Sequence, residues 1–413
     1  MKKTLAAVAV LGAFAASASA DVSVYGRFNT SLHVLDQNIE MMDAGGMVKV
    51  DKTTWDMATG DNTGARFGFK GSEKIADGLT AGFVLEAGFK GDTGAGDFFG
   101  REAIVYLGTD YGTFAAGKMG TVVGSAGSWA TFASHATFEG TGTSGLAGTG
   151  LFANAASRWG NMLAYKSPVM GGFQVLAQYS MGDATDNESV DNNRYAALAA
   201  KYQAGALTLV AAVDQVNKEA GVDGDDDAYT FNFGGNYDFG PFAISAGAQY
   251  FKGKQDIAGM LATNNANNKH TGGVTNGYKT TCVDKGETEN AEGFGVTFGL
   301  KAPVAGGNFH FSTTYVEGDA DVVVTTAWSG SKKDLDKLGL NTEVASSAAA
   351  TQEHGTFDFD AKAWNVGVMY DYNLSKNTYV YGSVAYTKYE ADSAAIAFEQ
   401  KKTEAYVGLV HKF

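Results

Sequence analysis

Cysteine and proline are scarce in this chain of 413 residues, which contains one Cys and three Pro. The single cysteine, Cys282, has no partner within the chain, so a disulfide-stabilised scaffold is excluded. Beyond residue 20 no run of about 18 apolar residues occurs, so no transmembrane helix is predicted. Basic residues are outnumbered, with 31 Lys and Arg against 45 Asp and Glu, and this disfavours nucleic-acid binding because phosphate contacts need concentrated positive charge.

Glycine and aromatic residues are abundant instead. The chain has 55 Gly, 26 Phe and 19 Tyr, and 45% of its residues are hydrophobic. This apolar content excludes an intrinsically disordered chain. The glycines follow no triplet repeat, which excludes a collagen.

The first 20 residues have the features of a secretory signal peptide. Lys2 and Lys3 precede an apolar run from Leu5 to Ala16, and Ala18-Ser19-Ala20 supplies a small-residue cleavage site. Residues 1–20 are therefore expected to be removed on export to the cell envelope. Residues 21–413 contain no linker and are expected to form one domain.

Apolar and polar residues alternate along much of the remaining chain with the period of two that is typical of β-strands. In Phe294–Leu300, for example, Phe, Val, Phe and Leu alternate with Gly, Thr and Gly. Tyr229–Tyr237, Phe309–Tyr315 and Trp364–Tyr372 have the same pattern. The fold class predicted is all-β.

A water-soluble β-sandwich also alternates, but three features favour a membrane barrel. The expected strands reach about nine residues or more, as strands that cross hydrocarbon do. The polar face is rich in Gly, Ser, Thr and Asn, which suit a wall facing water better than a packed core. Aromatic residues stand at expected strand ends, as in the aromatic girdles of membrane barrels: Tyr202, Tyr237, Tyr250, Tyr315, Tyr372 and Phe413.

The expected connections alternate between short and long. The short turns are Ser72–Gly78, Thr109–Tyr111, Pro168–Gly171, Gln203–Gly205, Asp238–Pro241, Ala302–Ala305 and Asn373–Lys376. The long links are His33–Asn62, Gly91–Phe99, Met119–Ser157, Gly182–Asp191, Lys218–Asp227, Gly253–Asn290, Gly318–Thr356 and Ala391–Gln400. These seven turns and eight links predict a 16-stranded antiparallel transmembrane β-barrel with short periplasmic turns and long external loops. A barrel of this size encloses an aqueous channel.

Four segments resemble the general porins of Gram-negative bacteria. Val22-Ser-Val-Tyr-Gly-Arg27, Ala65-Arg66-Phe-Gly-Phe-Lys-Gly71 and Phe99-Gly-Arg101-Glu-Ala resemble their first, second and fourth strands. Val407-Gly-Leu-Val-His-Lys-Phe413 resembles the last strand, most like that of beta-proteobacterial members, although His411 stands where Tyr is commoner. The resemblance extends over residues 21–413, with its specific motifs in the first 170 residues and the last ten.

The resemblance implies a homotrimer of 16-stranded barrels in the outer membrane, each with a third loop that folds inward. It also implies a terminal aromatic residue, here Phe413, that is read by the barrel-assembly machinery. The other expected partners are outer-membrane lipid and lipopolysaccharide, together with small hydrophilic solutes and ions. No nucleic acid is expected.

A basic wall is expected at the narrowest part of the pore. The resemblance places basic, lumen-facing side chains at Arg27, Arg66, Arg101, Lys118 and Arg158. Alternation agrees for Arg27 and Arg66, and a cation on the lipid face near mid-bilayer would cost about 2–4 kcal/mol. Strand phase conflicts at Arg101, because an inward Arg101 takes Val105 inward and turns Glu102 outward.

The acidic side of the constriction is assigned to Glu139, in the third loop, and to Glu86. A basic wall facing acidic groups creates a transverse field that orients dipolar solutes and separates ions by sign. Water and salt keep this field weak, so passive diffusion with weak, mildly anionic selectivity is the expected function.

Other functions have weaker support. A substrate-specific channel would bind one solute class, with Trp129 and Trp159 as the residues to inspect, and an adhesin would not conduct. An enzyme is not expected, because no nucleophile motif or paired histidine occurs. No cofactor and no metal are predicted: Gly140–Gly145 matches a dinucleotide fingerprint without its strand and helix, Asp223–Asp227 lacks calcium-loop spacing, and the six histidines are scattered.

Overall fold

The computed structural model describes residues 21–43, 46–138, 146, 148–153, 157–182, 194–217, 227–253, 269–271, 281–329, 349–393 and 397–413. The expected signal peptide and Glu139 lie outside these residues. No helix within these ranges is long and apolar enough to cross a membrane.

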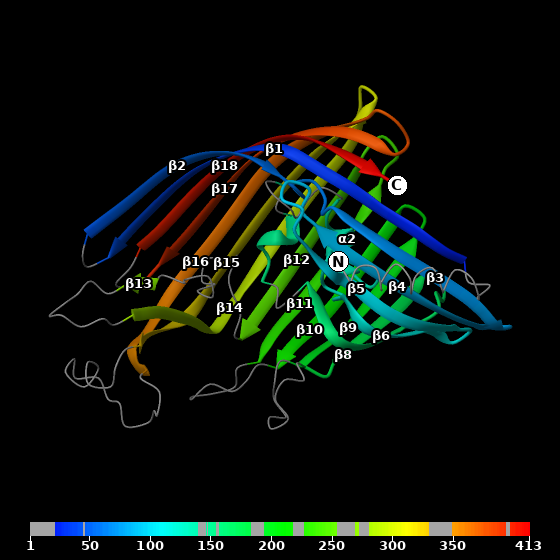
Figure 1. Ribbon diagram of the computed structural model, residues 1–413, viewed down its shortest axis with the longest axis horizontal. Coiled ribbons are helices and arrows are strands. Elements are labelled where there is room, and N and C mark those ends of the chain that lie inside the picture. The colour runs from blue at the N-terminus through cyan, green and yellow to red at the C-terminus, as the bar shows by residue number, and fades with distance from the viewer. Residues whose placement is uncertain are drawn as a thin grey trace, which may run out of the picture.

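The described strands form one antiparallel sheet that closes on itself (Figure 1). The ring consists of β1 (Asp21–Asp43), β3 (Arg66–Ala76), β4 (Leu79–Phe89), β5 (Gly96–Thr109), β6 (Gly112–Gly120), β7 (Arg158–Lys166), β8 (Phe173–Ser180), β9 (Arg194–Ala204), β10 (Leu207–Asn217), β11 (Ala228–Asp238), β12 (Ala243–Gly253), β14 (Thr281–Val304), β15 (Gly307–Ser329), β16 (Ala349–Asn373), β17 (Thr378–Asp392) and β18 (Ala397–Lys412). Two further strands, β2 (Gly46–Ala58) and β13 (Lys269–Thr271), form hairpins with β1 and β14 outside the ring. The expected 16-stranded barrel is confirmed.

Closure occurs at β1, which pairs along β18 on one side and with β3 and β2 on the other. Gly26 N donates to Phe413 O at 2.9 Å, and Phe413 N donates back to Gly26 O at 3.1 Å. A Cβ at Gly26 would lie 2.4 Å from the Phe413 ring, so glycine makes room for this aromatic side chain. Among the described residues, every strand of the ring pairs with a neighbour on each side, which is the closure that a membrane barrel needs.

The period-two pattern directs apolar side chains outward and polar side chains inward. On β11, Phe231 and Phe233 are 51% and 58% exposed, whereas Thr230 and Asn232 are buried on the inner side. Similar outward apolar residues occur around the ring, including Val24, Leu32, Val105, Leu163, Leu198, Val296, Val384 and Val407. A continuous exposed apolar surface of this kind fits a hydrocarbon environment rather than water.

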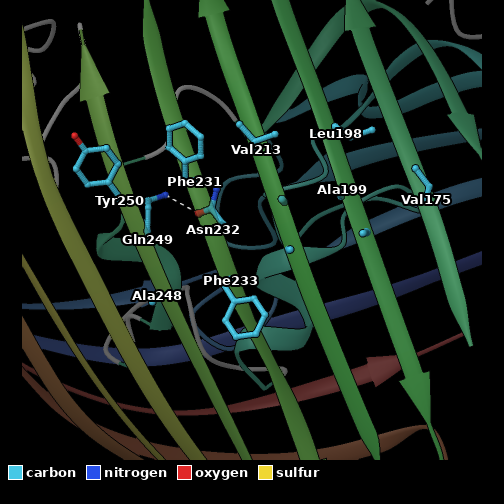
Figure 2. Close-up of a pocket in the computed structure, with 13 residues that line it drawn as sticks. Val175, Leu198, Ala199, Val213, Phe231, Asn232, Phe233, Ala248, Gln249 and Tyr250 are labelled. Atoms are coloured by element: carbon cyan, nitrogen blue, oxygen red, sulfur yellow. Dashed lines mark hydrogen bonds between the residues drawn. The ribbon is translucent and has the colours of Figure 1, made fainter.

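A shallow groove of about 630 Å³ lies on this apolar outer face across β8–β12. Figure 2 shows Val175, Leu198, Val213, Phe231 and Phe233 projecting from the strands, while Gln249 donates to Asn232 Oδ1 at 2.9 Å. The small residues Ala200, Ala211 and Ala248 form the floor. The groove belongs to the lipid-facing surface and is separate from the interior of the barrel.

Short connections and long segments alternate as expected. Residues 77–78, 205–206 and 305–306, for example, join β3 to β4, β9 to β10 and β14 to β15. Several expected connections are wrong in part, because strands continue through them. The expected turn Ser72–Gly78 contains the end of β3, Gly91–Phe99 contains the start of β5, and Ala391–Gln400 contains the end of β17 and the start of β18. His33–Asn62 contains the hairpin of β1 and β2, Gly253–Asn290 contains β13 and the start of β14, and Gly318–Thr356 contains the ends of β15 and β16.

Strands continue there because backbone pairing does not require an apolar outer face. On β14–β18 a row of outward aromatic residues, which includes Phe294, Tyr315, Trp364 and Tyr386, is followed by charged ones. Lys388 Nζ lies 2.8 Å from both Glu390 Oε1 and Glu399 Oε2. The ladder therefore extends beyond the apolar band, where sequence alternation loses its apolar half.

The third loop, between β6 and β7, folds into the barrel, as expected (Figure 1). Its helix α2 (Phe132–Ala136) packs against β10–β12, and its 3-10 helix η1 (Gly148–Leu151) packs against β14 and β15. Asn236 Nδ2 donates to His135 O at 3.0 Å, and Thr314 Oγ1 donates to Gly148 O at 2.7 Å. Buried apolar residues of the loop, such as Phe132, form the core between the loop and the inner wall.

Candidate pore constriction

The third loop and the wall formed by β1, β3, β4, β5 and β7 enclose a space of about 610 Å³ inside the barrel. Arg27, Arg66, Lys70, Arg101 and Arg158 line this space from the wall. The described part of the loop lines it with Ser125–Ser128, Ser134, Thr137 and Phe138. Arg27, Arg66, Arg101 and Arg158 were predicted on this wall from the sequence, whereas Lys70 and the loop hydroxyl groups were not.

Glu86 lies among the arginines. Arg101 Nε donates to Glu86 Oε1 at 2.6 Å, and Arg66 Nη1 lies 3.7 Å from the same oxygen. Tyr25 OH donates to Glu86 Oε2 at 3.1 Å. Glu86 was expected on the acidic side that opposes the arginines, and this placement is wrong. β4 stands between β3 and β5, so an inward carboxylate on β4 meets the basic side chains of both neighbours.

Glycine makes room for the Tyr25 ring beside this cluster. A Cβ at Gly68 would lie 2.6 Å from Tyr25 Cζ, closer than such atoms approach. The ring therefore lies flat over β3, and its hydroxyl reaches Glu86. Lys70 Nζ lies 5.4 Å from the centre of the same ring, in a cation–π contact.

Arg27 and Arg66 face each other directly across the β1–β3 ladder. Both donate to Thr63 Oγ1, Arg27 from Nη1 at 2.9 Å and Arg66 from Nη2 at 3.1 Å. Arg66 Nε also donates to Gly64 O at 3.0 Å. Two like charges directly opposite each other are unfavourable, and shared acceptors offset part of this cost.

Arg158 begins β7 and pairs with Gly120. It lines the same space as Arg66 and Arg101. Among the described residues, none accepts a hydrogen bond from its Nε. Arg158 therefore adds positive charge to the cavity that Glu86 does not pair with.

Lys118 is the basic residue that the structure moves away from this cluster. It pairs with Ala103 on β5, whose face of the strand carries the exposed Val105 and Leu107. Directly paired residues share one face of a sheet, so Lys118 lies on the outer face of the barrel. The prediction of an inward Lys118 is therefore wrong. The inward and outward positions of β6 are the reverse of those expected, up to the point where its ladder with β7 shifts between Gly117 and Met119.

The phase conflict at Arg101 and Glu102 is resolved by a bulge. The β4–β5 ladder shifts between Glu86 and Gly88, and Phe99 has a φ of 54°. Between these pairs β4 advances from Glu86 to Gly88, whereas β5 runs from Glu102 to Asp97. The extra residues on β5 break the alternation, so the neighbouring Arg101 and Glu102 both face the interior. The expected outward Glu102 is therefore wrong.

Glu102 has a structural role that sequence analysis missed. It is 2% exposed, and Ser128 donates to its carboxylate from the backbone N at 3.2 Å and from Oγ. The carboxylate thus fixes the third loop to the wall. The only feature of the sequence that could have indicated this role is the pair of neighbouring, oppositely charged residues within one strand. Both can face the interior only if the strand has a bulge.

The aromatic and basic residues near the loop are mostly packed. Trp129 is 3% exposed, and Lys166 Nζ lies 4.5 Å from the centre of its ring and donates to Ser128 O at 3.1 Å. Trp159 stacks on Tyr195 with 5.8 Å between ring centres. Burial lowers the pKa of His135, so this side chain is neutral at pH 7 and adds no charge.

The described residues hold no group of three or more His, Cys, Asp or Glu side chains arranged to bind a metal ion. The constriction is instead a water-accessible space with fixed charges. Such an arrangement filters solutes by size and charge and supplies no nucleophile held by a base.

The chain is similar to several known proteins. It is 26% identical to an outer-membrane porin protein of Bordetella pertussis over the full length of both. It is 28% identical to a monosaccharide porin of Halomonas, over 54% of this chain and 63% of that protein. The fold matches that of the anion-selective porin from Comamonas acidovorans with a TM-score of 0.57 and 19% identity, over 96% of this chain and all of that one.

The model of the Gram-negative porin family matches residues 6–392, most of the chain. The closed barrel, its apolar outer face and the charged interior agree with that match. The chain therefore belongs to the Gram-negative porin family and is a non-enzymatic channel of the outer membrane.

Proposed function

We propose that this channel admits ions and small hydrophilic solutes by passive diffusion, with weak charge selectivity set at the constriction. The observation that carries the proposal is the cluster of Arg27, Arg66, Arg101 and Arg158 around one 610 Å³ space beneath the third loop. Four guanidinium groups exceed the two carboxyl groups, those of Glu86 and Glu102, that line the same space. A mild preference for anions follows, although the whole chain has a formal net charge of −14.

The proposal also includes an acidic side of the constriction, formed by Glu139. We propose that the third loop presents Glu139 toward the basic wall, which creates a transverse field across the pore. Two charges about 4 Å apart in water are worth about 1 kcal/mol, and salt screens them within about 8 Å. The field therefore biases the path of an ion without trapping it.

The assembly and export of the channel are proposed on the same basis. Residues 1–20 act as a cleaved signal peptide, three copies form a homotrimer, and Phe413 is recognised by the barrel-assembly machinery. The exposed apolar band contacts outer-membrane lipid, and the charged strand ends above it contact lipopolysaccharide. Migration of the unheated protein as a trimer in a detergent gel tests the oligomeric state.

Planar-bilayer recording in a salt gradient tests the channel function. We expect an ohmic conductance that does not saturate with solute, and a reversal potential of the sign for anions. The second candidate is a substrate-specific channel, which the name of the Halomonas relative favours. Saturable conductance block by a monosaccharide would support this candidate, and a protein that does not conduct would contradict both.

A further inference from the structure

A second chain segment besides the third loop enters the barrel. Residues 59–65, which we term the inner strap, connect β2 to β3. Asp61, Asn62 and Thr63 are 4%, 3% and 6% exposed, as buried as residues of a core. Asn62, Thr63 and Gly64 line the constriction. The strap therefore lies between the barrel wall and the pore arginines.

Polar side chains of the wall hold the strap. Ser31 Oγ donates to Asp61 Oδ2 at 2.5 Å, and Asn29 Nδ2 donates to Thr63 O at 2.8 Å. Asn62 Nδ2 donates to Tyr379 OH at 3.1 Å. These contacts come from β1 and β17, so the strap is fixed from the side away from the lumen. Its lumenal side remains directed at the arginines.

Thr63 is the residue through which the strap contacts two arginines at once. Its backbone carbonyl is bound to the wall by Asn29, while its hydroxyl accepts from both Arg27 and Arg66. The two guanidinium groups, on directly opposed residues, would otherwise separate to reduce their repulsion. The Thr63 hydroxyl is a fixed acceptor that both groups share, in addition to the other contacts of each, such as Gly64 O for Arg66, and it holds the two guanidinium groups together on one side of the pore.

We propose that Thr63 is a positioning residue that sets the charge selectivity of the constriction by holding Arg27 and Arg66 side by side. This inference rests on the proposed function, because it concerns the field that selects permeating ions. Thr63 contributes no charge itself. It concentrates the charge of two arginines, so that a permeating anion meets both at one level of the pore.

The test compares variants of the full-length protein in planar bilayers. Thr63→Val keeps the side-chain shape but removes the acceptor, and we expect the anion-to-cation permeability ratio to fall about twofold as the guanidinium groups separate. Thr63→Ser keeps a hydroxyl and is expected to retain the wild-type ratio. If Thr63→Val does not form a detergent-resistant folded barrel, Thr63→Ala provides the same comparison.

Thr59→Val is the matched control within the strap. Thr59 Oγ1 accepts from the backbone N of Gly91 at 2.8 Å rather than from an arginine, so its loss should leave the ratio unchanged. Equal shifts in Thr59→Val and Thr63→Val would assign the effect to the strap as a whole and overturn the proposal. A wild-type ratio in a conducting Thr63→Val channel would overturn it while leaving the channel function intact, whereas a wild-type protein that does not conduct would overturn both.

Discussion

Two parts of the barrel wall differ in regularity and in chemistry. The strands β9–β12 and β14–β18, which we term the regular wall, have ladders whose register shifts only at Glu289–Glu292 and Val324–Thr325. The strands β3–β7, the irregular wall, have shifts at Lys74–Ala76, Glu86–Gly88 and Gly117–Met119. Three of the four pore arginines lie on the irregular wall.

Strands with unbroken alternation thus form the regular wall of the barrel, whereas strands with broken alternation carry most of the residues of the constriction. An unbroken ladder can direct only every second residue inward. Bulges release this restriction, so the irregular wall can place Glu86, Arg101 and Glu102 on one small area of its inner face. The shortest strands of the irregular wall, β6 and β7, have 9 residues each, whereas β14 and β16 of the regular wall have 24 and 25 (Figure 1).

The largest expected effect breaks the regular wall. Phe233 lies on the outer face of β11, between the aromatic pairs Phe231–Tyr250 and Tyr237–Phe239. Phe233→Arg places a cation in the middle of the apolar band and should lower the free energy of unfolding by about 2–4 kcal/mol. Urea unfolding in lipid vesicles measures this change. Phe233→Leu is the control and should cost less; equal costs would contradict a lipid-facing position.

The second prediction concerns the charge of the irregular wall. Replacing Arg66 and Arg101 by Ala leaves Glu86 without its two basic neighbours. The reversal potential in a salt gradient should then shift toward the cation side, and the anion-to-cation permeability ratio that it gives should fall severalfold. The control is Lys388→Ala, on the outer face of the regular wall, which should leave the ratio unchanged. An unshifted potential in the double variant would reject the basic wall.

A smaller effect is expected from the contact between Glu102 and the third loop. Glu102→Gln weakens charge-assisted hydrogen bonds from Ser128, each of which is worth about 1.5–3 kcal/mol. The loop should move more, and the open-channel current should become noisier at nearly unchanged selectivity. Ser134→Ala is the control, because the hydroxyl that it removes bonds only to the backbone of the same loop. The noise of the open-channel current should be unchanged in this variant.

Two substitutions should leave selectivity unchanged and so sharpen the comparison. Lys118→Ala removes a cation on the outer face, and His135→Asn removes a side chain whose lowered pKa keeps it neutral at pH 7. Both variants should have the wild-type reversal potential at pH 7. A cation-directed shift in Lys118→Ala would return this lysine to the pore, and one in His135→Asn would show that His135 is charged.

The fold was predictable wherever residues obey one simple alternation. Phe294–Leu300 and Trp364–Tyr372 indicated their strands directly, and the short turns followed from where alternation stopped. Above the apolar band this signal disappears, because the outward residues of β15 and β16 become charged while backbone pairing continues. The ends of these strands were therefore assigned to loops.

The residues that line the constriction were largely predictable from the sequence. Whether each side chain points into or out of the barrel was less predictable. The resemblance to porins selected Arg27, Arg66, Arg101 and Arg158, and the structure brings these four together. It also selected Lys118, which the phase of β6 turns outward. Directions near Glu102 depend on a bulge, and the role of Thr63 depends on a segment that reaches back across β1, so neither follows from local spacing.

The bulge before Arg101 has a consequence for how this channel can change over evolutionary time. The extra residues of β5 let adjacent codons perform separate tasks, since Arg101 lines the pore while Glu102 holds the loop. Substitutions at the first codon can retune which ions pass without loosening the loop. A deletion that removed the extra residues between Asp97 and Arg101 would restore strict alternation, turn one of the two charges toward lipid and couple the tasks again.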